Sequence, residues 1–185
     1  MDLHRLIVFC HVAAMIGLFA ALIVEGVSLT SLRRATSYEQ AREWAGLWTF
    51  LVPLGLPSLL VVLASGIYLA TTLGVWDSGW ARAAVPTLVL VAVAGGIVGP
   101  RRNRLRAAIA TSAGPLPRDL RLQLRQPLFL ASWYFRAALI VGLVFDMTAK
   151  PDLGGVLLIS TAAVIGIVLG LPAWTAHAST SEVGP

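Results

Sequence analysis

Long stretches without any charged side chain constrain the fold of this chain more than any other feature. The longest lies between Glu43 and Asp77. A transmembrane helix needs about 20 consecutive, mainly apolar residues. Of the 185 residues, 57% are hydrophobic and 12% are charged, whereas about 25% are charged in soluble domains. A single soluble core of this length could not bury so much apolar surface, and a disordered chain would be far more polar.

Five mainly apolar stretches, the fourth interrupted by Arg136 and Asp146, predict an all-α, polytopic helical membrane bundle in which residues 1–185 form a single membrane domain. The first apolar run, Leu6–Val24, is too long for the apolar region of a signal peptide and therefore predicts an uncleaved span. The predicted spans cover residues 6–29, 47–73, 82–100, 127–148 and 153–174, with a cytoplasmic basic loop at residues 101–126.

The basic residues indicate how these spans are oriented. The loop after the first span carries three arginines and the loop after the third carries seven, whereas the opposite side carries only Arg5, Arg82 and Lys150. Because cytoplasmic loops are enriched in Lys and Arg, we expect the N-terminus outside and the C-terminus in the cytoplasm.

The net charge of +5 does not indicate a nucleic-acid-binding protein, because the arginines cluster in short segments between apolar runs. We expect the lipid bilayer to be the partner instead, with anionic headgroups meeting the long inner loop. The second part of that loop, Arg118–Gln126, predicts a helix lying along the headgroups. The residues expected to meet headgroups are Arg101, Arg102, Arg104, Arg106, Arg118, Arg121 and Arg125.

Small residues recur at a spacing that allows close helix contact. Gly95 and Gly99 form one such pair, and Gly166 and Gly170 form another. These pairs predict packing within the bundle, or else a homodimer or a contact with another membrane protein.

Four ionisable side chains fall inside the predicted spans: His11, Glu25, Arg136 and Asp146. Such residues are costly in a bilayer, so they indicate a buried polar seam. His4, His11, Leu18 and Glu25 recur every seven residues and share one helix face. Estimated depths, at about 1.5 Å per residue, predict an inner Glu25–Arg136 pair and an outer His11–Asp146 pair.

Several chemistries remain open for these residues. The two pairs could have a purely structural role, in which they fix the register of the helices. Alternatively, the seam could bind or transfer a small ligand, an ion or a proton. His11 could be an axial ligand of haem b, with Met147 as a second ligand. A copper site could use His4, Cys10, His11 and Met147. With a single cysteine, no intramolecular disulfide can form, and no motif of a soluble enzyme is present, so we predict no catalytic residues.

The chain resembles a family of uncharacterised bacterial integral membrane proteins. It is more distantly similar to the membrane domain of copper-resistance D proteins and to the haem-binding membrane protoporphyrinogen oxidase. The likeness rests on His11 in CHVAAMIGLF, the segment SGIYLATTLG, Trp80, the loop LPRDLRLQLRQP and the segment MTAKPDL at Met147–Leu153. The resemblance implies a compact helical bundle in the bacterial inner (plasma) membrane and makes His11 the best candidate ligand. The third span lacks the lysine of the oxidase-like proteins, which argues against that activity.

The sequence thus predicts a non-enzymatic multi-pass membrane protein whose polar seam serves a small ligand, an ion or a proton. The alternatives are a haem-binding membrane redox protein with His11 as axial ligand, and a structural subunit of a membrane complex.

Overall fold

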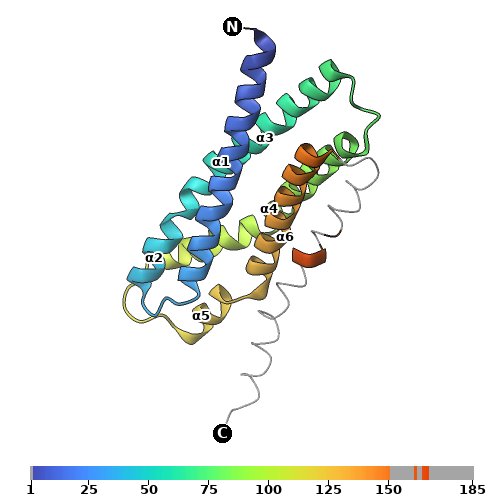
Figure 1. Cartoon of the computed structure of the whole chain (residues 1–185). Coiled ribbons are helices and arrows are strands. Elements are labelled where there is room, and N and C mark those ends of the chain that lie inside the picture. The colour runs from blue at the N-terminus through green and yellow to red at the C-terminus, as the bar shows by residue number, and fades with distance from the viewer. Residues whose placement is uncertain (1, 151–160, 162–163, 167–185) are drawn as a thin grey trace.

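The protein is an all-α bundle, described here by a computed structural model for residues 2–150, 161 and 164–166 (Figure 1). Four long helices and two short ones follow one another along this part of the chain. They are α1 (Leu3–Leu32), α2 (Tyr38–Gly46), α3 (Trp48–Leu73), α4 (Gly79–Ala110), α5 (Arg118–Leu124) and α6 (Pro127–Ala149).

Four helical segments are long and apolar enough to cross a membrane: Leu3–Leu32, Tyr38–Leu73, Gly79–Ala110 and Arg118–Ala149. The polytopic helical bundle predicted from the sequence is therefore confirmed, and the chain is a membrane protein. These segments correspond to the first four predicted spans. The fifth, at residues 153–174, lies outside the described residues except for positions 161 and 164–166.

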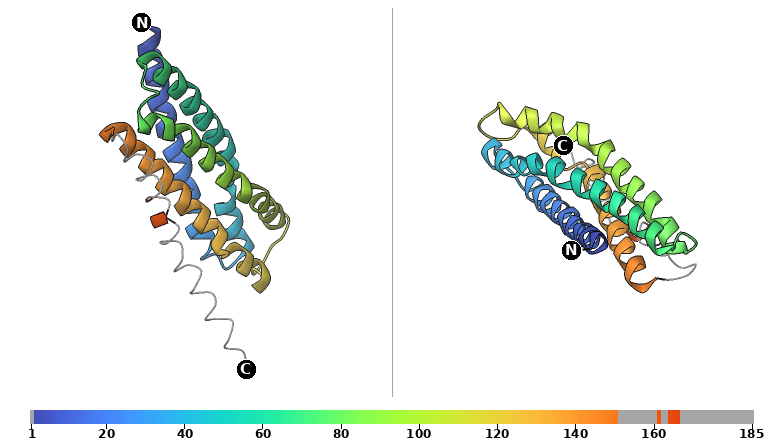
Figure 2. Two further views of the ribbon diagram at one scale, coloured as in Figure 1. Left: turned by 90° about the vertical axis from the view of Figure 1, so that its right-hand side faces the viewer. Right: turned by 90° about the horizontal axis from the view of Figure 1, so that it is seen from above.

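The long helices pack as two pairs. Helix α1 lies along α3 and α4 lies along α6 (Figure 2). The two pairs meet through smaller contacts of α1 with α6 and of α3 with α4. A cavity lies between the four helices.

Apolar side chains on the outside of the bundle are what a lipid environment requires. Large apolar residues are exposed along every long helix, among them Phe9, Ile16, Phe50, Ile97 and Val141. In water this surface would be unfavourable, whereas lipid tails solvate it as well as they solvate each other.

Helix α4 is longer than its predicted span. It continues through Pro100 to Ala110, so the first part of the predicted basic loop at 101–126 is helical. At about 1.5 Å per residue a helix of 32 residues is about 48 Å long, well beyond the roughly 30 Å of the hydrocarbon core. Helix α3 likewise runs without interruption past Pro53 and Pro57, although each proline removes one helix hydrogen bond.

The end of the bundle that carries α2 and α5 is closed by packing between the short segments. Helix α2, which the sequence did not predict as a separate element, begins after Ser37, whose side chain accepts a hydrogen bond from the amide of Gln40. The amide of Tyr38 donates to the carbonyl of Gly114 (2.9 Å), and the amide of Leu116 donates to the carbonyl of Thr36 (3.0 Å). These bonds hold the segments before α2 and before α5 side by side.

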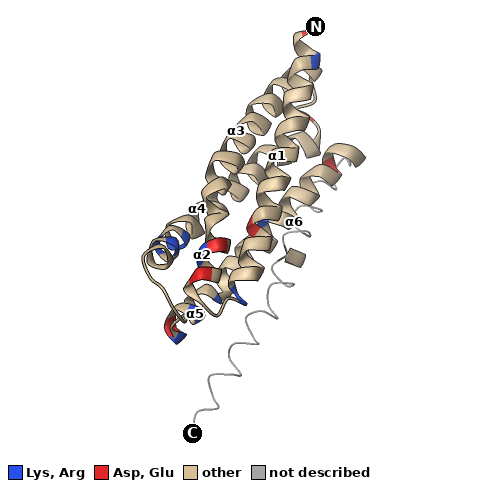
Figure 3. Ribbon diagram, turned by 90° about the vertical axis from the view of Figure 1, so that its left-hand side faces the viewer, with Lys and Arg blue, Asp and Glu red and all other residues tan. Residues whose placement is uncertain are grey.

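Most basic residues gather at this end of the bundle, around α2, α5 and the end of α4 (Figure 3). The short helix predicted in this region is present as α5, Arg118–Leu124. Arg33 and Arg125 hold it to the end of α1 by a reciprocal exchange, in which each guanidinium donates to the other residue's carbonyl (3.1 and 3.0 Å).

Candidate functional site

Glu25 lies at the centre of the polar contacts inside the bundle. It is on α1, seven residues before the end of that helix, which places it about 10 Å along the axis from the end. Its side chain is 5% exposed. Arg136 of α6 donates two hydrogen bonds to it, from Nη1 to Oε2 (2.8 Å) and from Nη2 to Oε1 (2.7 Å). The predicted Glu25–Arg136 contact is therefore confirmed, and it has the bidentate geometry that arginine forms with carboxylates.

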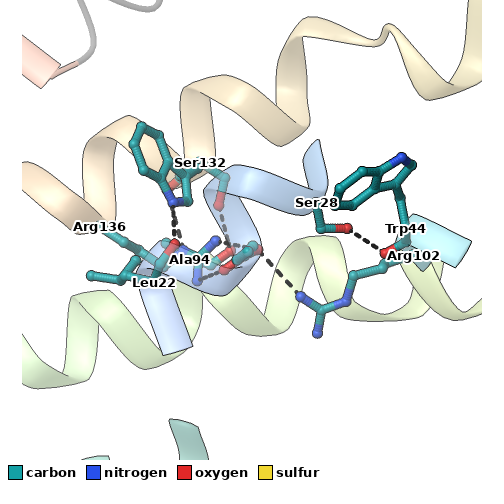
Figure 4. Close-up of polar contacts among 9 residues, drawn as sticks. Leu22, Ser28, Trp44, Ala94, Arg102, Ser132 and Arg136 are labelled. Carbon is teal, nitrogen blue, oxygen red and sulfur yellow. Dashed lines mark hydrogen bonds and ion pairs between the residues drawn. The ribbon is translucent and has the colours of Figure 1, made fainter. Parts of the chain in front are cut away.

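A second arginine joins the same carboxylate. Nη1 of Arg102, on α4, donates to Oε1 of Glu25 at 3.2 Å, so the two guanidinium groups approach it from different helices (Figure 4). Arg102 was expected to meet lipid headgroups in the basic loop, and that prediction is wrong for this residue, because it is buried, with only 8% of its surface exposed. Its guanidinium carbon also lies 6.0 Å from the centre of the Trp48 ring, within the range of a cation–π contact.

Neighbouring hydrogen bonds hold this cluster in place. Arg136 Nε donates to the carbonyl of Ser132 (3.2 Å), and the Ser132 hydroxyl donates to the carbonyl of Ala94 on α4 (3.0 Å). The indole of Trp133 donates to the carbonyl of Leu22 on α1 (2.8 Å). Three helices are thereby tied together around one carboxylate.

The two arginines differ in how many of their donors are used. All three nitrogens of Arg136 donate to groups of α1 or α6. By contrast, Nε of Arg102 is buried without a hydrogen-bond partner in the described part of the chain. Arginine carries five N–H donors, so Arg102 retains capacity to bind another acceptor.

These side chains line a cavity of about 290 Å³ between the four long helices. Glu25, Arg102 and Arg136 provide its charged groups, and the other lining residues are apolar. Two guanidinium groups against one carboxylate leave an excess of one positive charge. A volume near 300 Å³ is at the lower end of the range for small-molecule sites.

In the N-terminal half of α1, His11 does not form the predicted pair with Asp146. His11 Nδ1 lies 2.8 Å from the hydroxyl of Ser65 on α3, and not against Asp146. The Ser65 hydroxyl donates its own proton to the carbonyl of Val61. With the Ser65 hydroxyl proton engaged in this way, the tautomer that completes the contact carries its proton on Nδ1 and its free lone pair on Nε2.

Asp146 lies in the last turn of α6. It is completely buried, and neither carboxylate oxygen has a hydrogen-bond partner among residues 2–150, 161 and 164–166. The predicted His11–Asp146 pair is therefore wrong. A carboxylate without partners is among the most costly groups to bury.

Three of the candidate metal ligands lie on α1, and the fourth, Met147, lies on α6. Within the described residues no three His, Cys, Asp or Glu side chains are close enough to hold a metal ion. His4 is exposed and Cys10 is half-buried. Met147 lines a separate cavity of about 40 Å³ between α3 and α4, together with Trp76 and Trp80, and His11 is not among its lining residues.

Two of the four glycines, Gly95 and Gly166, make contacts inside the bundle. A side chain at Gly95 would lie 3.7 Å from Nη1 of Arg136, and one at Gly166 would clash with Ala138 and with the carbonyl of Tyr134 on α6. Gly99 faces open space and lines the charged cavity. Gly170 lies outside the described residues.

Arg102 and Trp48 are the site residues that sequence reasoning missed. Arg102 stands in a run of arginines after Pro100 and looks like a loop residue. The missed signal is helical spacing, because Gly95, Gly99 and Arg102 follow one another at intervals of four and three residues and so share a face of α4.

No family model matches this chain, and no curated protein or solved structure matches it.

Proposed function

We propose that this chain is a non-enzymatic, multi-pass protein of a bacterial plasma membrane that binds a small anionic ligand within the bilayer. The cavity between the four long helices is the binding site. The observation that supports this proposal is Arg102, a nearly fully buried guanidinium that lines the cavity and has an unpartnered Nε in the described residues.

The charge of the cluster favours an anion over a cation or a proton. Glu25 is already neutralised by Arg136 through two short hydrogen bonds. The remaining positive charge of Arg102 is costly in a low-dielectric interior unless an anion compensates it. A ligand carboxylate or phosphate would complete the charge balance and accept the free donors of Arg102.

The shape of the cavity favours a ligand with an apolar tail. Val52 and Leu56 of α3 line it and are both 53% exposed. Ala92 and Gly96 of α4 also line it and are exposed. The cavity is therefore open between α3 and α4 toward the lipid, so an amphiphilic anion could enter from the bilayer with its charged end toward Arg102.

Binding of decanoate to the protein in lipid nanodiscs tests this function. We expect saturable binding of radiolabelled decanoate, and little binding of decanol or decyltrimethylammonium, which lack a negative charge. Arg102→Gln should weaken decanoate binding about tenfold to hundredfold, as expected for the loss of a charged hydrogen bond.

Arg106→Gln is the matched control, because Arg106 is an exposed arginine of the same helix that lines none of the described cavities. Equal losses in the two variants, or equal binding of decanoate and decanol, would contradict the proposal. Circular dichroism of both variants separates a loss of binding from a loss of fold.

The hydrogen bond of His11 supports a second candidate function, binding of haem with His11 as axial ligand. Ligating histidines are usually oriented by a hydrogen bond at their other ring nitrogen, and Nδ1 of His11 lies at hydrogen-bond distance, 2.8 Å, from the hydroxyl of Ser65. Met147 lines a cavity of about 40 Å³ whose lining does not include His11, so this candidate function rests on His11 alone. Bound haem would supply one-electron redox chemistry.

The visible spectrum of the purified protein distinguishes the two candidates. Haem binding through His11 predicts a Soret band that His11→Ala removes and that His4→Ala, a change at an exposed position on the same face of α1, leaves in place. A colourless wild-type protein that binds decanoate would exclude the haem candidate and retain the first.

A further inference from the structure

A second cavity lies at the inner end of the bundle, outside the Glu25 cluster. It has a volume of about 370 Å³ and lies between the end of α4 and the junction of α5 with α6. Its polar lining consists of Arg101, Arg104, Gln123 and Gln126, and its apolar lining includes Leu105 and Phe129, which are buried.

The helical repeat explains why neighbouring arginines of α4 serve two different cavities. Arg101, Arg104 and Leu105 are three and four residues apart and therefore share one face of the helix. Arg102 is turned about 100° from Arg101 and contacts Glu25 instead. The cavity at the inner end is thus lined by two guanidinium groups that take no part in the cluster.

The chemistry of this cavity is suited to a phosphate group. Neither Arg101 nor Arg104 has an ion-pair partner in the described part of the chain, and no carboxylate lines the cavity. The amides of Gln123 and Gln126 add neutral donors. Helix α6 begins at Pro127 without a side-chain cap, so its positive end faces the same region.

Apolar residues on the same face of α4 indicate that the phosphate belongs to a lipid headgroup. Val93 and Ile97 are 53% and 59% exposed, and they precede Arg101 by eight and four residues. This spacing places them on the face that carries Arg101 and Arg104, up to about 12 Å further into the membrane. An acyl chain could lie along Val93 and Ile97 while its headgroup reaches the arginines.

We infer that this groove binds one anionic phospholipid of the inner leaflet, with its phosphate between Arg101 and Arg104. The inference is independent of the proposed function, because it uses the opposite face of α4 and other side chains. A general attraction of basic loops for an anionic surface would not depend on these two positions.

Native mass spectrometry tests the inference by counting the lipids that stay bound to the protein in detergent. The protein is titrated with phosphatidylglycerol or with phosphatidylcholine of the same acyl chains. We expect one phosphatidylglycerol to be retained in preference to phosphatidylcholine. The double variant R101Q/R104Q should bind it about 30-fold more weakly, from the contribution expected for two arginines.

The variant R118Q/R121Q is the matched control, since it removes the same charge from exposed positions of α5 that do not line the groove. An equal loss in both double variants would overturn the inference in favour of a diffuse surface charge. Displacement of the lipid by inorganic phosphate alone would overturn it in favour of a site for a free anion. Decanoate binding should be unchanged in R101Q/R104Q, so that failure of this inference and failure of the proposed function can be told apart.

Discussion

At the scale of single residues, Glu25 determines whether the two buried arginines can be accommodated. Its carboxylate accepts hydrogen bonds from both Arg102 and Arg136. Buried ion pairs often contribute little net stability relative to apolar residues, but removing one partner leaves an uncompensated charge. The cluster is therefore more sensitive to a loss of Glu25 than its share of the buried surface would indicate.

We expect Glu25→Gln to destabilise the protein by about 3–5 kcal/mol, because two guanidinium groups lose their counter-charge. Thermal unfolding in detergent, followed by tryptophan fluorescence, measures the change. Glu43→Gln, at an exposed position of α2, is the control and should leave the melting temperature unchanged. A melting temperature of Glu25→Gln equal to that of the wild type would show that the cluster does not hold the bundle together.

Asp146 presents the reverse case, because its carboxylate is buried without a hydrogen-bond partner in the described residues. We expect Asp146→Asn to raise the melting temperature by about 2–4 °C, the shift that corresponds to roughly 1 kcal/mol in a protein of this size. A lower melting temperature of the variant would show that the carboxylate is held by a partner beyond the described residues.

At the scale of helices, close packing between α1 and α6 depends on a residue without a side chain. A Cβ atom at Gly26 would lie 2.7 Å from Cζ2 of Trp133, which is closer than atoms in contact can approach. The same tryptophan donates a hydrogen bond to the carbonyl of Leu22. The position of α6, and with it that of Arg136, therefore depends on the space at Gly26.

We expect Gly26→Ala to destabilise the protein by about 1–3 kcal/mol, since the added methyl group must displace the indole. Gly46→Ala is the matched control, because a side chain there meets no atom within 4 Å. Both variants can be compared by thermal unfolding in the same detergent. If Gly26→Ala were as stable as Gly46→Ala, the contact between α1 and Trp133 would not determine how the helices pack.

At the scale of the whole molecule, the charge distribution indicates which end faces the cytoplasm. Figure 3 shows the basic residues gathered at the end formed by α2, α5 and the last turns of α4. That end contains the packed cluster of Trp48, Leu105 and Phe129. The orientation and the fifth span both remain predictions that a labelling experiment can decide.

We expect single cysteines introduced into a Cys10→Ala background to be labelled by an impermeant maleimide according to this orientation. Asp77→Cys, between α3 and α4, should react in intact spheroplasts. Ala113→Cys, between α4 and α5, should react only after permeabilisation, as should Ser179→Cys if the predicted fifth span crosses the membrane. Labelling of Ala113→Cys in intact spheroplasts would reverse the orientation, and labelling of Ser179→Cys there would exclude the fifth span.

By itself, the sequence determined the fold class, the positions of the described spans and the Glu25–Arg136 contact. These follow from local properties: uncharged stretches of sufficient length must cross the bilayer, and depth along a helix follows from its constant rise. Which helix faces lie against each other was decided only by the tertiary structure. That packing brought Arg102 to Glu25 and Ser65 to His11, and it left Asp146 without a described partner. Contacts between helices depend on how each helix is rotated about its axis and on how closely the side chains pack. The pattern of apolar and charged residues along the chain specifies neither of these.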